Sequence, residues 1–252
     1  MRLPDAFLRA PIAHRALHGP GRPENSLAAV RAAVAAGYGI EIDVQPSADA
    51  VAMVYHDDTL DRLTGAEGPV AARTAAELGA ITLAGGDAGI PTLAEVLDAV
   101  AGRVALLIEI KDQDGAMGPG VGGLERAVAR ALEGYGGPVA VMSFNPHSVA
   151  AMAALAPEVP RGLTTYGWDD AEAQALPEAR RAELAAIADF ERVGASFISH
   201  DRRDLGAPRV AKLKARGVPV LCWTVRTAEQ ESQAREIADN ITFEGYAAAL
   251  PA

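Results

Sequence analysis

Four charged residues occur as two pairs, each with one residue between its members. Glu41 and Asp43 lie in one short apolar run, and Glu109 and Lys111 lie in another. Residues two apart on a β-strand face the same side of the sheet. If these runs are strands, each pair places two charged groups on one face, where an ordinary hydrophobic strand has none.

Three of these residues are carboxylates, and neighbouring strands would bring them together. Glu41, Asp43 and Glu109 would then repel one another and raise their own pKa values. A hard divalent cation removes that repulsion, and a set of oxygen ligands suits Mg²⁺ or Ca²⁺. We therefore predict a Mg²⁺ or Ca²⁺ site formed by these three carboxylates.

Cationic side chains stand beside the predicted metal site. Arg15 follows another apolar run, and Lys111 lies two residues after Glu109. With the cation they form a site for an anionic group such as phosphate, because arginine can bind two oxygens at once. Trp223, near the end of a later run, is predicted to be either buried core or a surface for a substrate carbon chain.

Two histidines lie where they could act on that anion. His14 precedes Arg15, and His56 ends a short apolar run. One imidazole would deprotonate an attacking hydroxyl and the other would protonate the leaving alcohol, since their ordinary pKa is about 6.5. Each motif alone is more often a solvated strand end or a surface turn, but their appearance at successive run ends favours a single site. His18 is a further candidate for contacting substrate, and His200 for supporting the site.

Short apolar runs alternate with segments of helical period along most of the chain. The predicted strands are Pro11–His14, Gly39–Val44, Val104–Lys111, Val139–Phe144, Arg161–Tyr166, Ser196–His200, Val218–Val225 and Asn240–Glu244. The predicted helices are Ser26–Ala36, Thr92–Val100, Leu124–Gly134, Pro146–Ala156, Pro177–Val193, Pro208–Arg216 and Thr227–Ala238, with only Tyr246–Leu250 left to form an eighth. This alternation predicts a parallel sheet closed into an α/β barrel, a fold that places catalytic groups at the carboxyl ends of its strands.

One segment interrupts the alternation. Val51–Tyr55 follows the second strand too closely for a helix, so it is predicted to be a strand-like excursion from it. The polar, Gly/Ala-rich residues 57–91 are predicted to form a small insertion. Barrels of this kind reach about 250 residues, so the chain is predicted to be one domain, 1–252, that includes the insertion. Gly115–Gly123 is predicted to be a mobile linker rather than a phosphate-binding loop.

Composition limits the classes of partner. The net charge of −10 disfavours nucleic acid and anionic membranes, which reward clustered Lys and Arg. The single cysteine, Cys222, fits a reducing compartment and predicts a buried free thiol. No stretch has the ~20 apolar residues needed to cross a bilayer, and the first residues lack a signal-peptide core. We therefore predict a cytoplasmic protein without stable membrane anchoring, and whether it forms a homodimer stays open.

The informative residues follow the order of the motifs in glycerophosphodiester phosphodiesterases, which the sequence resembles. The matching segments are His14–Arg15, Pro23–Ser26, Glu41–Asp43, His56–Asp57, Glu109–Lys111, Ser143–Phe144 and Trp223–Val225. Ala16 departs from the glycine usual after His-Arg, Ser26 replaces a threonine, and Asn240–Glu244 differs from the family's usual final strand. These departures bear on the shape of the pocket and leave every predicted metal or acid–base group in place.

The resemblance implies a TIM (β/α)8 barrel with a small insertion after the second strand, as in bacterial cytoplasmic members. Such enzymes cleave deacylated phospholipids, for example glycerophosphocholine, into glycerol 3-phosphate and an alcohol. The glycerol 2-hydroxyl is a candidate first nucleophile, which would give a cyclic intermediate that water opens. Glu24 is implied to orient Arg15 or the first loop. The remaining implied roles are metal binding for Glu41, Asp43 and Glu109, acid–base catalysis for His14 and His56, and phosphate binding for Arg15 and Lys111.

Three other functions remain open from the sequence. A phosphodiester lyase resembling bacterial phosphoinositide phospholipase C or sphingomyelinase D would stop at a cyclic phosphate; the acidic charge and missing secretion signal count against it. A carbon-acid lyase with Lys111 as base would leave the two histidines without a paired role. A non-catalytic phosphate-binding relative would be expected to lose a histidine or a carboxylate, and this chain retains them all.

Overall fold

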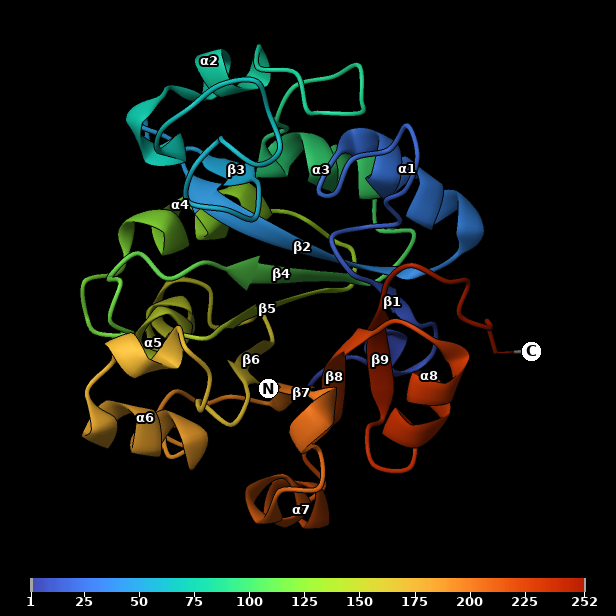
Figure 1. Ribbon diagram of the computed structural model, residues 1–252, viewed down its shortest axis with the longest axis vertical. Coiled ribbons are helices and arrows are strands. Elements are labelled where there is room, and N and C mark those ends of the chain that lie inside the picture. Colours follow the sequence, from blue (N-terminus) through green and yellow to red (C-terminus); the bar gives the residue numbers. More distant parts are fainter. Residues whose placement is uncertain (1, 252) are drawn as a thin grey trace.

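The computed structural model describes residues 2–251, in which eight parallel strands close into a barrel (Figure 1). The barrel strands are β1 (Ile12–Ala13), β2 (Gly39–Pro46), β4 (Leu106–Ile110), β5 (Val139–Ser143), β6 (Arg161–Thr165), β7 (Phe197–Asp201), β8 (Val220–Val225) and β9 (Asn240–Phe243). Each pairs with the next barrel strand along the chain, and β9 pairs back with β1 to close the ring. The predicted TIM barrel with an insertion after its second strand is confirmed.

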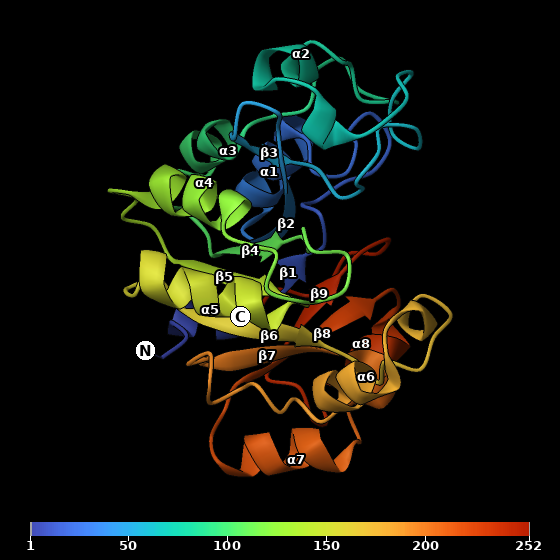
Figure 2. The same cartoon turned by 90° about the vertical axis from the view of Figure 1, so that its left-hand side faces the viewer.

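Helices cover the outside of the ring (Figure 2). They are α1 (Leu27–Ala36), α3 (Leu93–Val100), α4 (Gly123–Leu132), α5 (Pro146–Leu155), α6 (Glu178–Ala185), α7 (Pro208–Ala215) and α8 (Ala228–Ala234). Local signals set several ends: the Ser26 hydroxyl caps α1, and Thr92 and Glu95 form a capping box on α3. Within residues 2–251, no helix combines the length and the apolar character needed to span a bilayer.

Side chains of the barrel strands alternate between the helices and the barrel interior. Ile42 of β2 and Ile108 of β4 belong to the large hydrophobic core between strands and helices. The residues between such positions point the other way. Glu41, Asp43 and Glu109 therefore face the interior of the barrel, as their spacing predicts.

Apolar residues fill the barrel interior below these carboxylates. Phe7, from a short 3-10 helix at Asp5–Leu8, packs with Ile12, Leu107 and Leu221 in a buried cluster of its own. The amino-end half of the interior is thus a packed core, and the polar groups lie at the carboxyl ends of the strands, where barrel enzymes carry their sites.

Residues 57–91 form the predicted insertion, which lies beyond α1 and α3 in both views (Figures 1 and 2). It is entered through β3 (Ala52–Val54), which runs antiparallel to β2. It contains α2 (Ala75–Gly79), whose five residues are too few for a helical period to show in the sequence. A Cβ at Gly89 would lie 1.9 Å from the Gly79 carbonyl oxygen, so only glycine fits this crossing. Five residues of the insertion pack with Met53 and Tyr55 of the preceding segment in a small buried cluster: Leu60, Val70, Leu78, Leu83 and Ile90.

Two helices are clearly shorter than predicted, since α8 ends at Ala234 and not at Ala238, and one expected helix is absent. Helix α6 is much shorter than the predicted Pro177–Val193, because Ile187 adopts a left-handed φ of 52° that stops the helix. Tyr246–Leu250 contains no helix. This last segment is held instead by tertiary contacts, since the carbonyl of Ala248 accepts a 2.6 Å hydrogen bond from the Tyr38 hydroxyl.

Candidate active site

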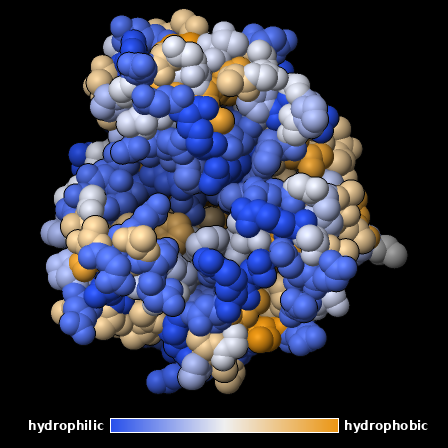
Figure 3. Space-filling view, viewed as in Figure 1, coloured by the Kyte–Doolittle hydropathy of each residue, from blue (hydrophilic) through white to orange (hydrophobic). Residues whose placement is uncertain are grey.

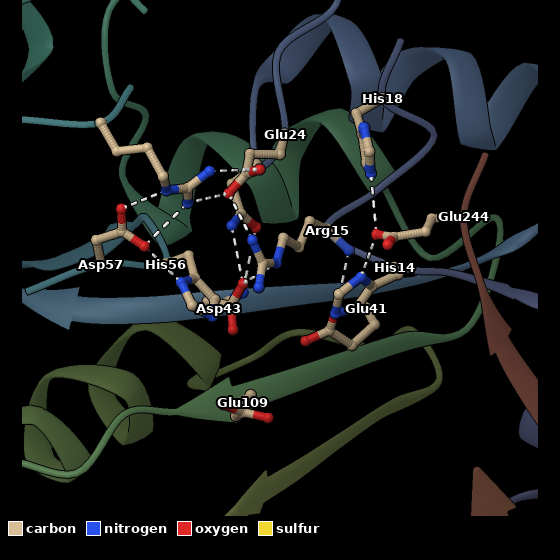
Figure 4. A network of polar contacts seen from close by, with 12 residues as sticks. His14, Arg15, His18, Glu24, Glu41, Asp43, His56, Asp57, Glu109 and Glu244 are labelled. Atoms are coloured by element: carbon tan, nitrogen blue, oxygen red, sulfur yellow. Dashed lines mark hydrogen bonds and ion pairs between the residues drawn. The ribbon is translucent and has the colours of Figure 1, made fainter. Parts of the chain in front are cut away.

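Three buried carboxylates meet at the mouth of the barrel (Figure 4). Asp43 of β2 and Glu109 of β4 are direct register partners, and Glu41 lies two residues before Asp43 on the same face. One oxygen of each lies within 4.8 Å of the others. Burial, followed by the charges of Asp43 and Glu109, raises the pKa of Glu41 well above its ordinary value. Glu41 therefore resists ionisation unless positive charge is added among the three groups.

Lys111 and Arg15 supply positive charge from two sides. Lys111 Nζ lies 2.6 Å from Asp43 Oδ1 and 2.5 Å from Glu109 Oε1, and Arg15 Nε lies 3.7 Å from Asp43 Oδ2. Burial alone would raise the pKa of Asp43, but the charges of Lys111 and Arg15 outweigh it and hold that pKa well below its ordinary value. The site thus combines fixed anions and cations in one small buried volume.

His14 follows β1 and is backed by a carboxylate from the end of β9. Its Nδ1 lies 2.7 Å from Glu244 Oε2, while its backbone N–H donates to the Phe243 carbonyl at 2.9 Å. Glu244 Oε2 also lies 3.5 Å from His18 Nε2, and Oε1 lies 2.7 Å from an Arg226 nitrogen. Its contact with His14 is the main cause that holds the pKa of Glu244 well below its ordinary value. The Nδ1 side of His14 is therefore occupied by an anion.

His56 lies on the other side of the site and, like His14, has a carboxylate beside its Nδ1. Its Nδ1 lies 2.6 Å from Asp57 Oδ1, and Asp57 is held by two hydrogen bonds from Arg62. Arg62 also donates twice to Glu24, which in turn accepts from Arg15 Nη1 at 2.8 Å. Burial, assisted by the charges of Lys111 and Arg15, lowers the pKa of His56. The neutral imidazole is thus favoured.

The loop after β1 is fastened to the carboxylates of β2. The Arg15 amide donates to Glu41 Oε2 at 2.8 Å, and Asn25 Nδ2 donates to Asp43 Oδ2 at 2.9 Å. Arg15, Ala16 and Asn25 have positive φ angles of 51°, 63° and 58°. Ala16 thus stands in a left-handed conformation at the position where the resemblance expects glycine.

These residues surround a cavity of about 200 Å³. Both histidines, Arg15, Lys111 and the three carboxylates line it, and Met142, Phe144 and Trp223 form the apolar part of its wall. Figure 3 shows this hollow near the centre of the face, bordered mainly by hydrophilic residues. The indole N–H of Trp223 donates to the Ser199 carbonyl at 3.0 Å, and its ring meets Phe144 edge to face at 5.5 Å. Trp223 therefore faces the cavity with a fixed orientation.

Other predicted residues lie outside this arrangement. His200 is fully buried between Thr165, 2.7 Å from its Nδ1, and Asp204, 3.2 Å from its Nε2, and it does not line the cavity. Cys222 is a buried free thiol as predicted, and burial raises its pKa to about 12. In the stretch Gly115–Gly123, several amides donate to Asp112 and Asp114. Those amides are engaged within the loop.

Sequence reasoning assigned no role to several residues of this network. Glu244 directly follows the last barrel strand, β9, so the rule that points to strand ends could have included it. Asn25 lies in the matched segment Pro23–Ser26, but no pattern in the sequence indicates its contact with Asp43. Arg62 carries no sequence signal, because its importance comes from contacts made across the insertion.

Comparisons with known proteins identify the sequences and structures to which this chain is similar. The model of the glycerophosphoryl diester phosphodiesterase family matches residues 14–240. The Bacillus subtilis (strain 168) protein YhdW is 30% identical over 231 residues, 85% of each chain. The glycerophosphodiester phosphodiesterase of Caldanaerobacter subterraneus subsp. tengcongensis is 35% identical over 167 residues, 60% of this chain and 65% of that protein. An Oleispira antarctica phosphodiesterase, solved in complex with the product sn-glycerol-3-phosphate, has a TM-score of 0.78 at 25% identity, covering 95% of this chain and 94% of that one.

Proposed function

The chain belongs to the glycerophosphoryl diester phosphodiesterase family, and on this premise we propose that it hydrolyses glycerophosphodiesters by metal-assisted catalysis with two histidines. The proposed products are sn-glycerol 3-phosphate and an alcohol. The observation that carries the proposal is the convergence of three buried carboxylates and two carboxylate-backed histidines on one cavity. The product bound to the Oleispira antarctica phosphodiesterase supports the proposed product.

The carboxylate cluster fits a hard divalent cation. The three carboxylates offer only oxygen atoms as ligands and are nearly inaccessible to solvent: Glu41, Asp43 and Glu109. Burial and the charges of the other two raise the pKa of Glu41. We therefore assign these three residues as ligands of Mg²⁺ or Ca²⁺. When bound, the cation would stabilise negative charge on the phosphoryl oxygens.

Arg15 and Lys111 are assigned to the phosphate. The Nε of Arg15 is buried and has no hydrogen-bond partner among the described residues, although its Nη1 is engaged by Glu24. A buried donor without a partner is costly unless a ligand supplies the acceptor. A phosphate oxygen at the cavity would satisfy it, with the charge of Lys111 beside it.

The histidines are assigned as the general acid–base pair. Glu244 and Asp57 occupy the two Nδ1 atoms, which favours the tautomer with Nδ1–H and directs both Nε2 atoms toward reacting groups. One imidazole removes the proton of the attacking hydroxyl or water, and the other donates a proton to the leaving alkoxide. Trp223, Phe144 and Met142 would contact the carbon atoms of the substrate.

The test is product analysis with a panel of glycerophosphodiesters that differ in their alcohol. Release of sn-glycerol 3-phosphate, followed enzymatically and by phosphorus NMR, is the expected result. A cyclic phosphate that accumulates without opening would refute hydrolysis and favour the lyase. We also propose a cytoplasmic location, which the single cysteine supports.

A further inference from the structure

Arg62 lies in the insertion and holds together two side chains that support the site. We infer that Arg62 is a positioning residue, which fixes the orientations of His56 and Arg15 at the same time. The inference rests on the proposed function, because it gives the insertion a part in the same reaction. It is carried by the contacts of the guanidinium group and not by its charge alone.

The guanidinium group of Arg62 donates twice to each of two carboxylates. Its Nε and Nη2 lie 2.7 and 2.9 Å from the Oδ2 and Oδ1 of Asp57. Its Nη2 and Nη1 lie 2.7 and 3.1 Å from the Oε1 and Oε2 of Glu24. Two parallel hydrogen bonds fix the rotation of a carboxylate as well as its distance, which a single contact does not.

Each of these carboxylates then holds a residue that lines the cavity. Asp57 Oδ1 lies 2.6 Å from His56 Nδ1, and Glu24 Oε1 accepts from Arg15 Nη1 at 2.8 Å. Figure 4 shows these dashed contacts running from His56 and Asp57 across to Glu24 and Arg15. A change in Arg62 would therefore be transmitted to an acid–base histidine and to a phosphate ligand together.

The insertion holds Arg62 at this place by its own packing. Leu60 is fully buried in the cluster of the insertion, and its carbonyl accepts from the Thr64 hydroxyl at 2.8 Å and from the Thr64 amide at 3.1 Å. This turn fixes the backbone on both sides of Arg62. Because 46% of the Arg62 side chain is exposed, its ion pairs contribute little to the stability of the fold. Its removal is expected to affect turnover far more than folding.

The experiment compares Arg62→Met and Arg62→Lys with Arg73→Met, a control in the same insertion. Among residues 2–251, the Arg73 side chain bonds only to the Glu67 carbonyl. We expect kcat to fall about 10- to 100-fold in Arg62→Met, as is typical when the support of a functional side chain is lost. Arg62→Lys should restore little, since an ammonium group cannot make paired contacts with two carboxylates. The urea midpoints of both Arg62 variants should stay close to that of the parent protein. The kcat of Arg73→Met should also stay close to the parent value.

A double-mutant cycle distinguishes positioning from a general structural effect. In a background that carries both Asp57→Asn and Glu24→Gln, which breaks both paths beforehand, Arg62→Met should lower kcat by less than about threefold. Nitrogen–proton NMR spectra of the histidine rings add a readout that needs no turnover: Arg62→Met should reduce the Nδ1–H tautomer of His56. An inactive parent protein would overturn the proposed hydrolysis, while the NMR comparison would still decide the role of Arg62. Additive losses in the cycle, kcat within twofold of the parent, or an unchanged His56 tautomer would overturn the inference.

Discussion

Glu244 offers a direct test of the acid–base assignment, because its carboxylate contacts the Nδ1 atom of His14. No sequence motif assigns a role to this residue. Its Oε2 lies 2.7 Å from His14 Nδ1, and 18% of its side chain is exposed. In Glu244→Gln the amide oxygen can still accept from Nδ1–H, so the tautomer of His14 is retained and the negative charge is lost. In Glu244→Ala both the charge and the acceptor are lost.

The size of the effect follows from the strength of that contact. A hydrogen bond to a charged group contributes about 1.5–3 kcal/mol, and about 1.4 kcal/mol corresponds to a tenfold change in rate. If the contact stabilises the imidazolium of His14 in the transition state, kcat should fall about tenfold in Glu244→Gln and about 150-fold in Glu244→Ala. The larger loss in the alanine variant reflects the orientation that glutamine preserves.

The assay is the steady-state release of sn-glycerol 3-phosphate from a glycerophosphodiester, with the urea midpoint measured alongside. Glu229→Gln is the matched control, because Glu229 is an exposed carboxylate at the start of the adjacent helix α8. Glu244→Ala with a kcat within twofold of that control would refute the role of the carboxylate behind His14. Equal losses in the glutamine and alanine variants would refute the separation of charge from orientation.

Four further expectations concern the metal, the second histidine, the first loop and a buried histidine. EDTA should stop turnover and added Mg²⁺ or Ca²⁺ should restore it; activity indifferent to the chelator would remove the cation from the mechanism. His56→Ala should lower kcat at least about 100-fold with an unchanged circular dichroism spectrum, and near-normal rates would defeat the pairing. Ala16→Gly should keep or raise the free energy of unfolding by up to about 1 kcal/mol, because glycine relieves the left-handed backbone; a clear loss in urea titration would contradict this. Burial, and then the charge of Arg209, lowers the pKa of His200, so the unfolded chain binds that proton first as the pH falls. The difference in free energy of unfolding between the parent and His200→Asn should therefore be largest above about pH 6.5 and decrease below it. A difference between the two urea midpoints that stays constant from pH 7 to 5 would disprove this.

Most of the barrel could be predicted because its determinants are local. Ile40, Ile42 and Val44 alternate with Glu41 and Asp43, and that alternation alone defines a strand with one polar face. The order of strands then follows from the strand–helix alternation, since successive strands of such a barrel are neighbours. The structure adds the register, which sets Asp43 opposite Glu109. No pattern within either strand contains that information.

The supporting contacts could not be predicted, because they depend on how loops cross and not on periodicity. Arg62 and Glu24 are 38 residues apart and meet only because the insertion lies over the loop after β1. The insertion is held by tertiary packing, which includes helix α2 and the close approach of Gly89 to Gly79. Its sequence has no extended hydrophobic periodicity. Short segments of this kind carry too few residues for an amphipathic pattern to identify them.

The loop after β1 shows how the site and the fold depend on each other. Asn25 has a φ of 58°, a left-handed conformation that non-glycine residues seldom adopt, and its amide bonds to Asp43 at 2.9 Å. Such a conformation persists when the surrounding contacts fix it, and here these contacts come from the same carboxylates that are proposed to bind the cation. The amide of Arg15 is held by Glu41 in the same way. It follows that a change in a proposed metal ligand would also loosen the loop that carries His14, so the loss of turnover in such a variant cannot be assigned to the metal alone without a measurement of cation binding.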